Sequence, residues 1–221
     1  MVFCWLVAAA AGFCTGKAGA AEVLVEDVVA VVNRHVITRS EVWQEAVMVL
    51  VERRGVSGLQ LEITPEFLER VLEMLINQRV LLDEARHLGL PLETRQERAD
   101  LLEGFRRSFG DPDLYARFLL KYDLDAEAVG DILARHLRVE RLKERKLRVM
   151  PEISDEEIKG YHRKHRHDLG GAPLEQVAEA IRLKLITQRR DKRLSRWVWE
   201  LRKRSEVKVL VELGPGDEDA P

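Results

Sequence analysis

Two short runs of β-branched residues begin the patterned part of the chain. Residues 28–32 read VVAVV and residues 36–37 read VI, and the polar tripeptide NRH separates them. Because β-branched side chains suit a pleated strand, the pattern predicts a short pair of strands. Residues 207–211, which read VKVLV, alternate in character and predict a terminal strand.

Between these strands, apolar residues recur at the spacing of an α-helix. The predicted helices are residues 38–55, 64–89, 92–108, 114–119 and 126–149, one helix within residues 151–169, and residues 173–204. Thr38-x-x-Glu41 and Ser154-x-x-Glu157 match the capping box that starts a helix. The apolar stripe of residues 64–89 is wide, which indicates a helix buried on more than one side. The pattern therefore predicts a mainly α protein.

Residues 1–20 are apolar and end in the small residues AGA, which fit the cleavage site of a signal peptide. We therefore expect export, with cleavage after Ala20. A membrane anchor is the alternative, although the apolar run is shorter than the ~20 residues that span a bilayer. Both cysteines, Cys4 and Cys14, lie in this segment, so the exported chain would contain no disulfide.

The composition describes a folded chain, with 46% hydrophobic and 33% charged residues among 221. The formal net charge of -2 excludes a general attraction for nucleic acids. The last predicted helix is nevertheless basic, because residues 182–204 contain ten lysines and arginines against Asp191 and Glu200. An export signal argues against nucleic-acid binding. We interpret the basic helix as a solvated face, or as a surface that attracts acidic clients or anionic surfaces weakly.

We identify no catalytic constellation, phosphate-binding loop or cofactor motif in the sequence. His162, His165 and His167 form the best candidate for a metal site, but they lack the cysteine or carboxylate partners of a typical catalytic zinc site. We expect these histidines to be solvated at the end of a helix. The sequence therefore predicts neither a bound metal nor a cofactor.

Four segments, taken in their order along the chain, carry a resemblance to a known family. They are VVNRHVIT at residues 31–38, LINQRVLLDEARHLGL at 75–90, VMPEISDEEIKGYHRKH at 149–165 and LSRWVWELRKRSEVKVLVE at 194–212. Together they resemble the SurA family of periplasmic chaperones, over about residues 25–212. Relatives carry parvulin-type prolyl isomerase domains before the last helix, but here only residues 168–172 occupy that place. The chain is therefore similar to the chaperone core alone, and we expect no enzyme activity.

The resemblance implies a mainly α, multi-helix SurA N-terminal-like domain with a small sheet formed by the N- and C-terminal strands. The core would span residues 21–212, with an N-terminal helical part (25–150), a connecting helix (151–169) and a C-terminal helix and strand (173–212). The last helix would return to pack on the N-terminal part. Residues 213–221 would form a disordered acidic tail.

The same resemblance implies a periplasmic chaperone that binds unfolded or nascent envelope proteins, outer-membrane proteins among them, without ATP. The alternative is a dedicated structural or assembly partner of one envelope protein. Client binding requires exposed apolar surface, and aromatic residues surround the helix break at residues 110–112. The candidate client-binding residues are Phe105, Phe109, Tyr115, Phe118 and Tyr122.

Trp197 and Trp199 lie two residues apart, so they cannot share one face of a helix. We expect one of them to pack against the N-terminal part, with Trp43 as its partner, and the other to be more exposed. The Gly170-Gly171 hinge before the last helix could also let this helix pack on a second copy. A helix-swapped homodimer is therefore a further hypothesis.

Overall fold

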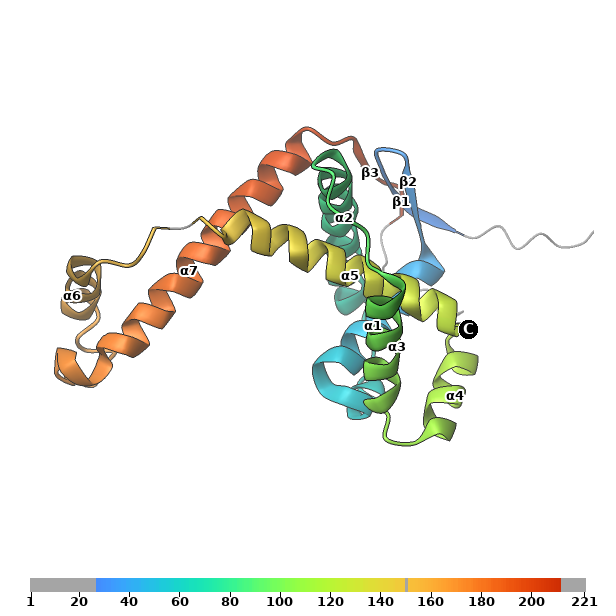
Figure 1. Cartoon of the computed structure of the whole chain (residues 1–221), viewed down its shortest axis with the longest axis horizontal. Coiled ribbons are helices and arrows are strands. Elements are labelled where there is room, and N and C mark those ends of the chain that lie inside the picture. Colours follow the sequence, from blue (N-terminus) through green and yellow to red (C-terminus); the bar gives the residue numbers. More distant parts are fainter. Residues whose placement is uncertain (1–26, 150, 212–221) are drawn as a thin grey trace, which may run out of the picture.

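The computed structural model describes residues 27–149 and 151–211 and shows a mainly α protein (Figure 1). These residues form seven α-helices, one short 3-10 helix and one three-stranded antiparallel sheet. The predicted fold class, mainly α with a small sheet built from both ends of the chain, is confirmed. The expected signal peptide, residues 1–20, and the expected acidic tail, residues 213–221, lie outside the described residues.

The small sheet joins segments from the two ends of the described chain. It consists of β1 (Val28–Val32), β2 (His35–Thr38) and β3 (Val207–Val209), in the order β2-β1-β3. In the turn between β1 and β2, Asn33 has a φ of 54°, a conformation that asparagine adopts more readily than most residues. The Asn33 backbone N–H donates to the Glu206 carbonyl at 2.7 Å, and its side-chain oxygen accepts from the Glu206 N–H at 2.9 Å. The turn therefore holds the segment that leads into β3.

Helices make up most of the other described residues. They are α1 (Arg39–Arg54), α2 (Pro65–His87), α3 (Arg95–Arg107), α4 (Pro112–Lys121), α5 (Ala126–Leu147), α6 (Asp155–Lys164) and α7 (Leu174–Lys203), with the 3-10 helix η1 (Gly55–Gln60) after α1. Within the described ranges, no helix combines the length and the apolar character that crossing a membrane requires.

The starts of these helices follow local cap signals. Four residues expected at helix starts accept a hydrogen bond from a backbone N–H in the first turn: Thr38, Thr64, Asp125 and Ser154. α3 begins three residues later than predicted, because Thr94 caps it and forms a capping box with Glu97. The Glu41 carboxylate, predicted to complete a box with Thr38, is directed at Arg79 of α2.

The body of the molecule contains two apolar clusters that share α1. The first lies between the sheet, α1, α2, α5 and the end of α7, and it includes Leu75, Ile76 and Leu142, which are at most 1% exposed. The second lies between α1, α3, α4 and α5. α2 contacts α1, α5, α7 and the sheet, so its predicted burial on more than one side is confirmed.

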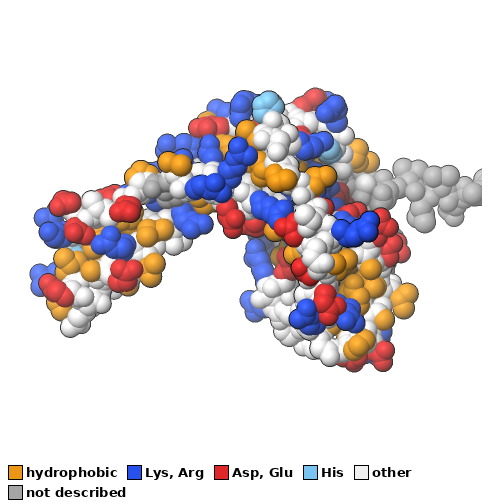
Figure 2. Space-filling model, in the orientation of Figure 1, with side chains coloured by type: hydrophobic (Ala, Val, Ile, Leu, Met, Phe, Trp, Pro, Cys, Tyr) orange, Lys and Arg blue, Asp and Glu red, His pale blue; other side chains and the backbone are white. Residues whose placement is uncertain are grey.

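α7 is one 30-residue helix that packs on two separate cores. Its last turns place Trp197 and Leu201 in the first cluster of the body, where each is 5% exposed. Its first turns place Ile181 against Ile153 and Ile158, in a small cluster beside α6. α6 and the first half of α7 therefore form an arm that projects from the body (Figures 1 and 2). A helix-swapped dimer stays a prediction.

The two tryptophans near the end of α7 lie in different environments, as predicted. Trp197 is buried, and the Lys146 Nζ lies 4.8 Å from the centre of its ring. Trp199 is 55% exposed. Trp43 packs against the same cluster as Trp197 and also lines a hollow beside Tyr122. The described residues show no ring contact between Trp43 and Trp197, the partner predicted for it.

The two tryptophans provide a matched test of how α7 is held on the body. We expect Trp197→Ala to lower the free energy of unfolding by about 3–5 kcal/mol, because it leaves a cavity in the first cluster. The control Trp199→Ala should change it by less than about 1 kcal/mol, because that ring is largely solvated. Urea denaturation followed by circular dichroism measures both values. Equal losses in the two variants would contradict the described packing.

Candidate functional site

Three of the five aromatic residues predicted to bind clients are buried in a core cluster. Phe105, Phe109 and Phe118 are 6%, 4% and 3% exposed, and their ring centres lie 5.1–5.9 Å apart. Buried side chains of α1 and α5 complete this cluster. The predicted exposed surface is therefore wrong for these three residues, because side chains of α1 and α5 cover their rings, although residues 110–112 themselves are exposed.

Tyr115 and Tyr122 lie at the edge of this cluster and are partly buried. The Tyr115 ring packs on Phe109 at 5.3 Å between ring centres, and burial raises the pKa of the Tyr115 hydroxyl. Tyr122 lines a hollow of about 310 Å³ together with Trp43 and Leu61. A role for these two tyrosines in client binding stays a prediction.

A hollow of about 950 Å³ lies between α1, α2, α5 and α7, and we call it the central groove. It exists because the last turns of α7 pack on α2 and α5 but leave part of the surface of α1 uncovered. Its apolar lining comes from four helices: Val49 of α1, Met74 and Leu81 of α2, Val139 of α5, and Leu194, Val198 and Trp199 of α7. The sequence periodicity did not reveal this surface, because no single helix contains it.

The exposed tryptophan stands at the α7 side of the central groove. Lys203 Nζ lies 3.8 Å from the centre of the Trp199 ring, which holds the ring in place by a cation-π contact. Trp199 is 55% exposed and adjoins the apolar lining of the groove, and aromatic rings contribute much of the energy of peptide binding. Trp199 is therefore the strongest single candidate for contact with a bound chain.

The floor of the central groove contains a buried charged network between α1 and α5. Glu45 is completely buried, and its Oε1 accepts a hydrogen bond from His136 Nε2 at 2.5 Å. The other ring nitrogen, Nδ1, lies 3.2 Å from Glu52 Oε1. Burial lowers the pKa of His136, but its hydrogen bonds and ion pairs with Glu45 and Glu52 outweigh that effect and raise the pKa to about 9. His136 is therefore protonated at neutral pH and donates from both nitrogens.

Two buried oxygen atoms among the lining residues have no hydrogen-bond donor within the described part of the chain: Glu45 Oε2 and Gln78 Oε1. An Arg135 nitrogen lies 3.8 Å from Glu45 Oε2, which gives attraction but not a hydrogen bond. Unpaired buried acceptors are unfavourable. Both side chains are buried, so these oxygens are part of the packed floor beneath the groove and not of its accessible surface.

An ion pair at the rim holds α7 beside α2. Arg202 donates from both terminal nitrogens to Glu73, at 2.5 Å to Oε2 and 3.1 Å to Oε1. This hydrogen bonding holds the pKa of the Glu73 carboxyl below its usual value and raises the pKa of Arg202. Bidentate pairing of this kind fixes orientation as well as distance. The ion pair therefore fixes the position of α7 relative to α2, the two helices that form opposite walls of the central groove.

The three histidines of the arm do not converge on a common point. His162 Nε2 lies 2.8 Å from the Ala172 carbonyl, and His165 Nδ1 lies 3.0 Å from Asp168. The His165 ring also stacks on Tyr161 at 4.2 Å between ring centres. Among the described residues there is no group of three or more histidine, cysteine, aspartate or glutamate side chains that could hold a metal.

One feature of the sequence indicated the buried network: a charged residue, Glu45, at a helical position that is otherwise apolar. Glu45 follows Val42 by three residues and precedes Val49 by four, so it occupies an apolar face of α1. A charged residue at such a position needs a buried partner. The partner, His136, lies 91 residues away and could not be identified from local pattern.

Comparison with known proteins adds no family assignment. No family model matches the chain, and no curated protein matches it significantly.

The network predicts a specific loss of stability at alkaline pH. Folding raises the pKa of His136 from 6.5 to about 9. The contribution of protonated His136 to the free energy of unfolding is therefore fully present below about pH 6.5 and is lost as the pH rises towards 9. We expect the free energy of unfolding to fall by on the order of 3 kcal/mol across this interval. Urea denaturation at a series of pH values measures it.

Two variants isolate the contribution of this histidine. His136→Gln should remove most of the decline, since glutamine does not titrate. His87→Gln, which changes an exposed histidine near the end of α2, should retain it. A His136→Gln protein with the same slope as the unmodified chain would show that another group is responsible.

Proposed function

We propose that the chain is an exported holding chaperone, similar to the core of the SurA family without its prolyl isomerase domains. It would act in the periplasm, bind unfolded or nascent envelope proteins and use neither ATP nor a catalytic residue. The observation that carries the proposal is the central groove, an open hollow of about 950 Å³ with an exposed tryptophan at its side. The resemblance of the four sequence segments supplies the functional class.

The lining of the central groove suits a ligand that is a chain without fixed structure. Apolar side chains such as Met74 and Val198 can contact the side chains of an unfolded segment, and the polar side chains of Asn77 and Ser195 in the same lining can hydrogen-bond with its backbone. Neither kind of contact selects a particular sequence strongly. Such contacts account for holding many clients with modest affinity, because ordering a flexible chain offsets part of the binding energy.

The absence of a requirement for ATP follows from this mode of binding. A segment held by modest apolar contacts dissociates spontaneously, and a client that folds buries the surface by which it was held. The projecting arm adds a second surface beside the body (Figure 2). The arm and the body together would limit contact between clients while their segments are exposed.

The direct test is suppression of aggregation without nucleotide. The purified protein should slow the aggregation of a denatured outer-membrane barrel protein and of an unrelated soluble protein, measured by light scattering. Trp199→Ala should weaken the apparent affinity about five- to tenfold, because it removes an aromatic contact of the central groove. The control Leu120→Ala removes an apolar side chain that is 84% exposed on α4 and should have no effect.

The outcomes separate the two functions considered. Suppression of neither client would contradict the proposed chaperone and favour a dedicated assembly partner of one envelope protein. Suppression that is unchanged in Trp199→Ala would place client binding outside the central groove.

A further inference from the structure

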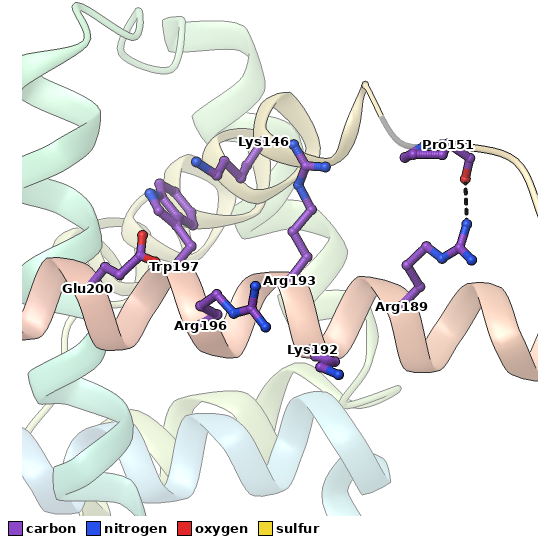
Figure 3. A pocket seen from close by; sticks show the side chains of 8 residues that line it. All are labelled: Lys146, Pro151, Arg189, Lys192, Arg193, Arg196, Trp197 and Glu200. Atoms are coloured by element: carbon purple, nitrogen blue, oxygen red, sulfur yellow. Dashed lines mark hydrogen bonds between the residues drawn. The ribbon is translucent and has the colours of Figure 1, made fainter.

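A third hollow, of about 440 Å³, lies on the side of α7 opposite the central groove, where α5 ends (Figure 3). We call it the basic junction. Its charged lining consists of Lys146, Arg189, Lys192, Arg193, Arg196 and Glu200, and Trp197 and Pro151 complete it. Arg193 extends from α7 towards the end of α5, and the Lys146 side chain runs from α5 towards the Trp197 ring. Figure 2 shows basic side chains gathered where the two helices cross.

The cations of the basic junction differ in what already binds them. Arg189 is occupied: it donates to the carbonyls of Pro151 and Glu152, at 3.1 Å each, and pairs with Glu157 of α6. Lys146 lies over the Trp197 ring. The side chains of three further cations form no hydrogen bond or ion pair within the described ranges: Lys192, Arg193 and Arg196.

The three unpaired cations are exposed to solvent, and their like charges lie close together on α7. Lys192 and Arg196 are four residues apart on one helix, where like charges repel. Glu200 is the one carboxylate that lines the hollow, against five cations. The whole chain carries a formal charge of -2, so the concentration of positive charge is local and not a consequence of composition. The basic junction is therefore suited to a ligand with several negative charges.

The shape of the row of cations indicates an extended ligand. From residue 189 to residue 196 a basic side chain recurs at each turn of α7, so the row is about 10 Å long at ~1.5 Å per residue. Carboxylates on alternate residues of an extended chain are about 7 Å apart and can match such a row. A single phosphate group would reach only part of it. Arginine guanidinium groups also pair well with carboxylates, through two parallel hydrogen bonds.

We propose that the basic junction binds an acidic segment of a polypeptide, and that this segment belongs to the same unfolded client whose apolar part occupies the central groove. This inference rests on the proposed function. α7 supports it because its two sides differ: Leu194 and Val198 line the central groove, whereas Arg193 and Arg196 line the basic junction. A flexible client that crosses α7 contacts both sides. The positive charge also raises the rate at which acidic clients are captured.

The test uses the purified protein and a short fluorescein-labelled peptide that alternates glutamate and serine. Fluorescence anisotropy at low salt should show binding, and the same peptide with glutamine in place of glutamate should not bind. Arg193→Glu/Arg196→Glu should weaken binding about tenfold or more, because it reverses two charges of the row. The matched control is Arg95→Glu/Arg117→Glu, which makes the same change of net charge at two exposed arginines on α3 and α4. It should change binding less than about twofold.

Three results would overturn the inference. The first is no binding of the glutamate peptide, and the second is equal loss in both double variants, which would indicate general charge attraction. The third is binding to phosphatidylglycerol vesicles that requires Arg193 and Arg196 while the peptide does not bind, which would assign the surface to a membrane. Failure of peptide binding with aggregation still suppressed would overturn this inference and leave the proposed function intact.

Discussion

The packing of the last turns of α7 on α2 and α5 is the interaction on which the rest of the structure depends. Trp197 and Leu201 fill the first cluster of the body, and this places Glu206 beside Asn33 and allows β3 to pair with β1. The same packing supplies one wall of the central groove. α7 is about 45 Å long at ~1.5 Å per residue, so its first half extends beyond the body and packs on α6. The arm and the groove are therefore consequences of one docked helix.

The charged groups differ between the inside of the body and the place where α7 crosses α5. Inside the body, acids and bases from α1, α2 and α5 pair across the helix contacts, as Glu45 does with His136 and Glu41 with Arg79. At the crossing of α5 and α7, Lys192, Arg193 and Arg196 have no such partners among the described residues, and they line a hollow that faces away from the central groove. A helix that presents apolar residues on one side and unpaired cations on another can bind a ligand of mixed character. An unfolded polypeptide has that character.

Local signals in the sequence were sufficient to locate the helices and strands but not to identify the candidate binding site. Cap residues and apolar periodicity located the helices, and the spacing of Trp197 and Trp199 predicted that one would be buried and the other exposed. The capping box at Thr94 was also readable from the sequence, although it was missed. Periodicity could not show that α1 covers Phe105 and its neighbours, because that contact joins distant segments. The central groove depends on four helices and could be recognised only once they were packed.

Site-specific photo-crosslinking tests the central claim most directly, because it reports where a bound polypeptide lies on the protein. A photoreactive phenylalanine analogue would replace Trp199 or Asn77 at the central groove, and Leu120 on α4 as a control outside it. Illumination in the presence of a denatured outer-membrane barrel protein should yield crosslinked client from the two groove positions and little from the control. Crosslinking of equal yield at all three positions, or from the control alone, would contradict the assignment of client binding to the central groove.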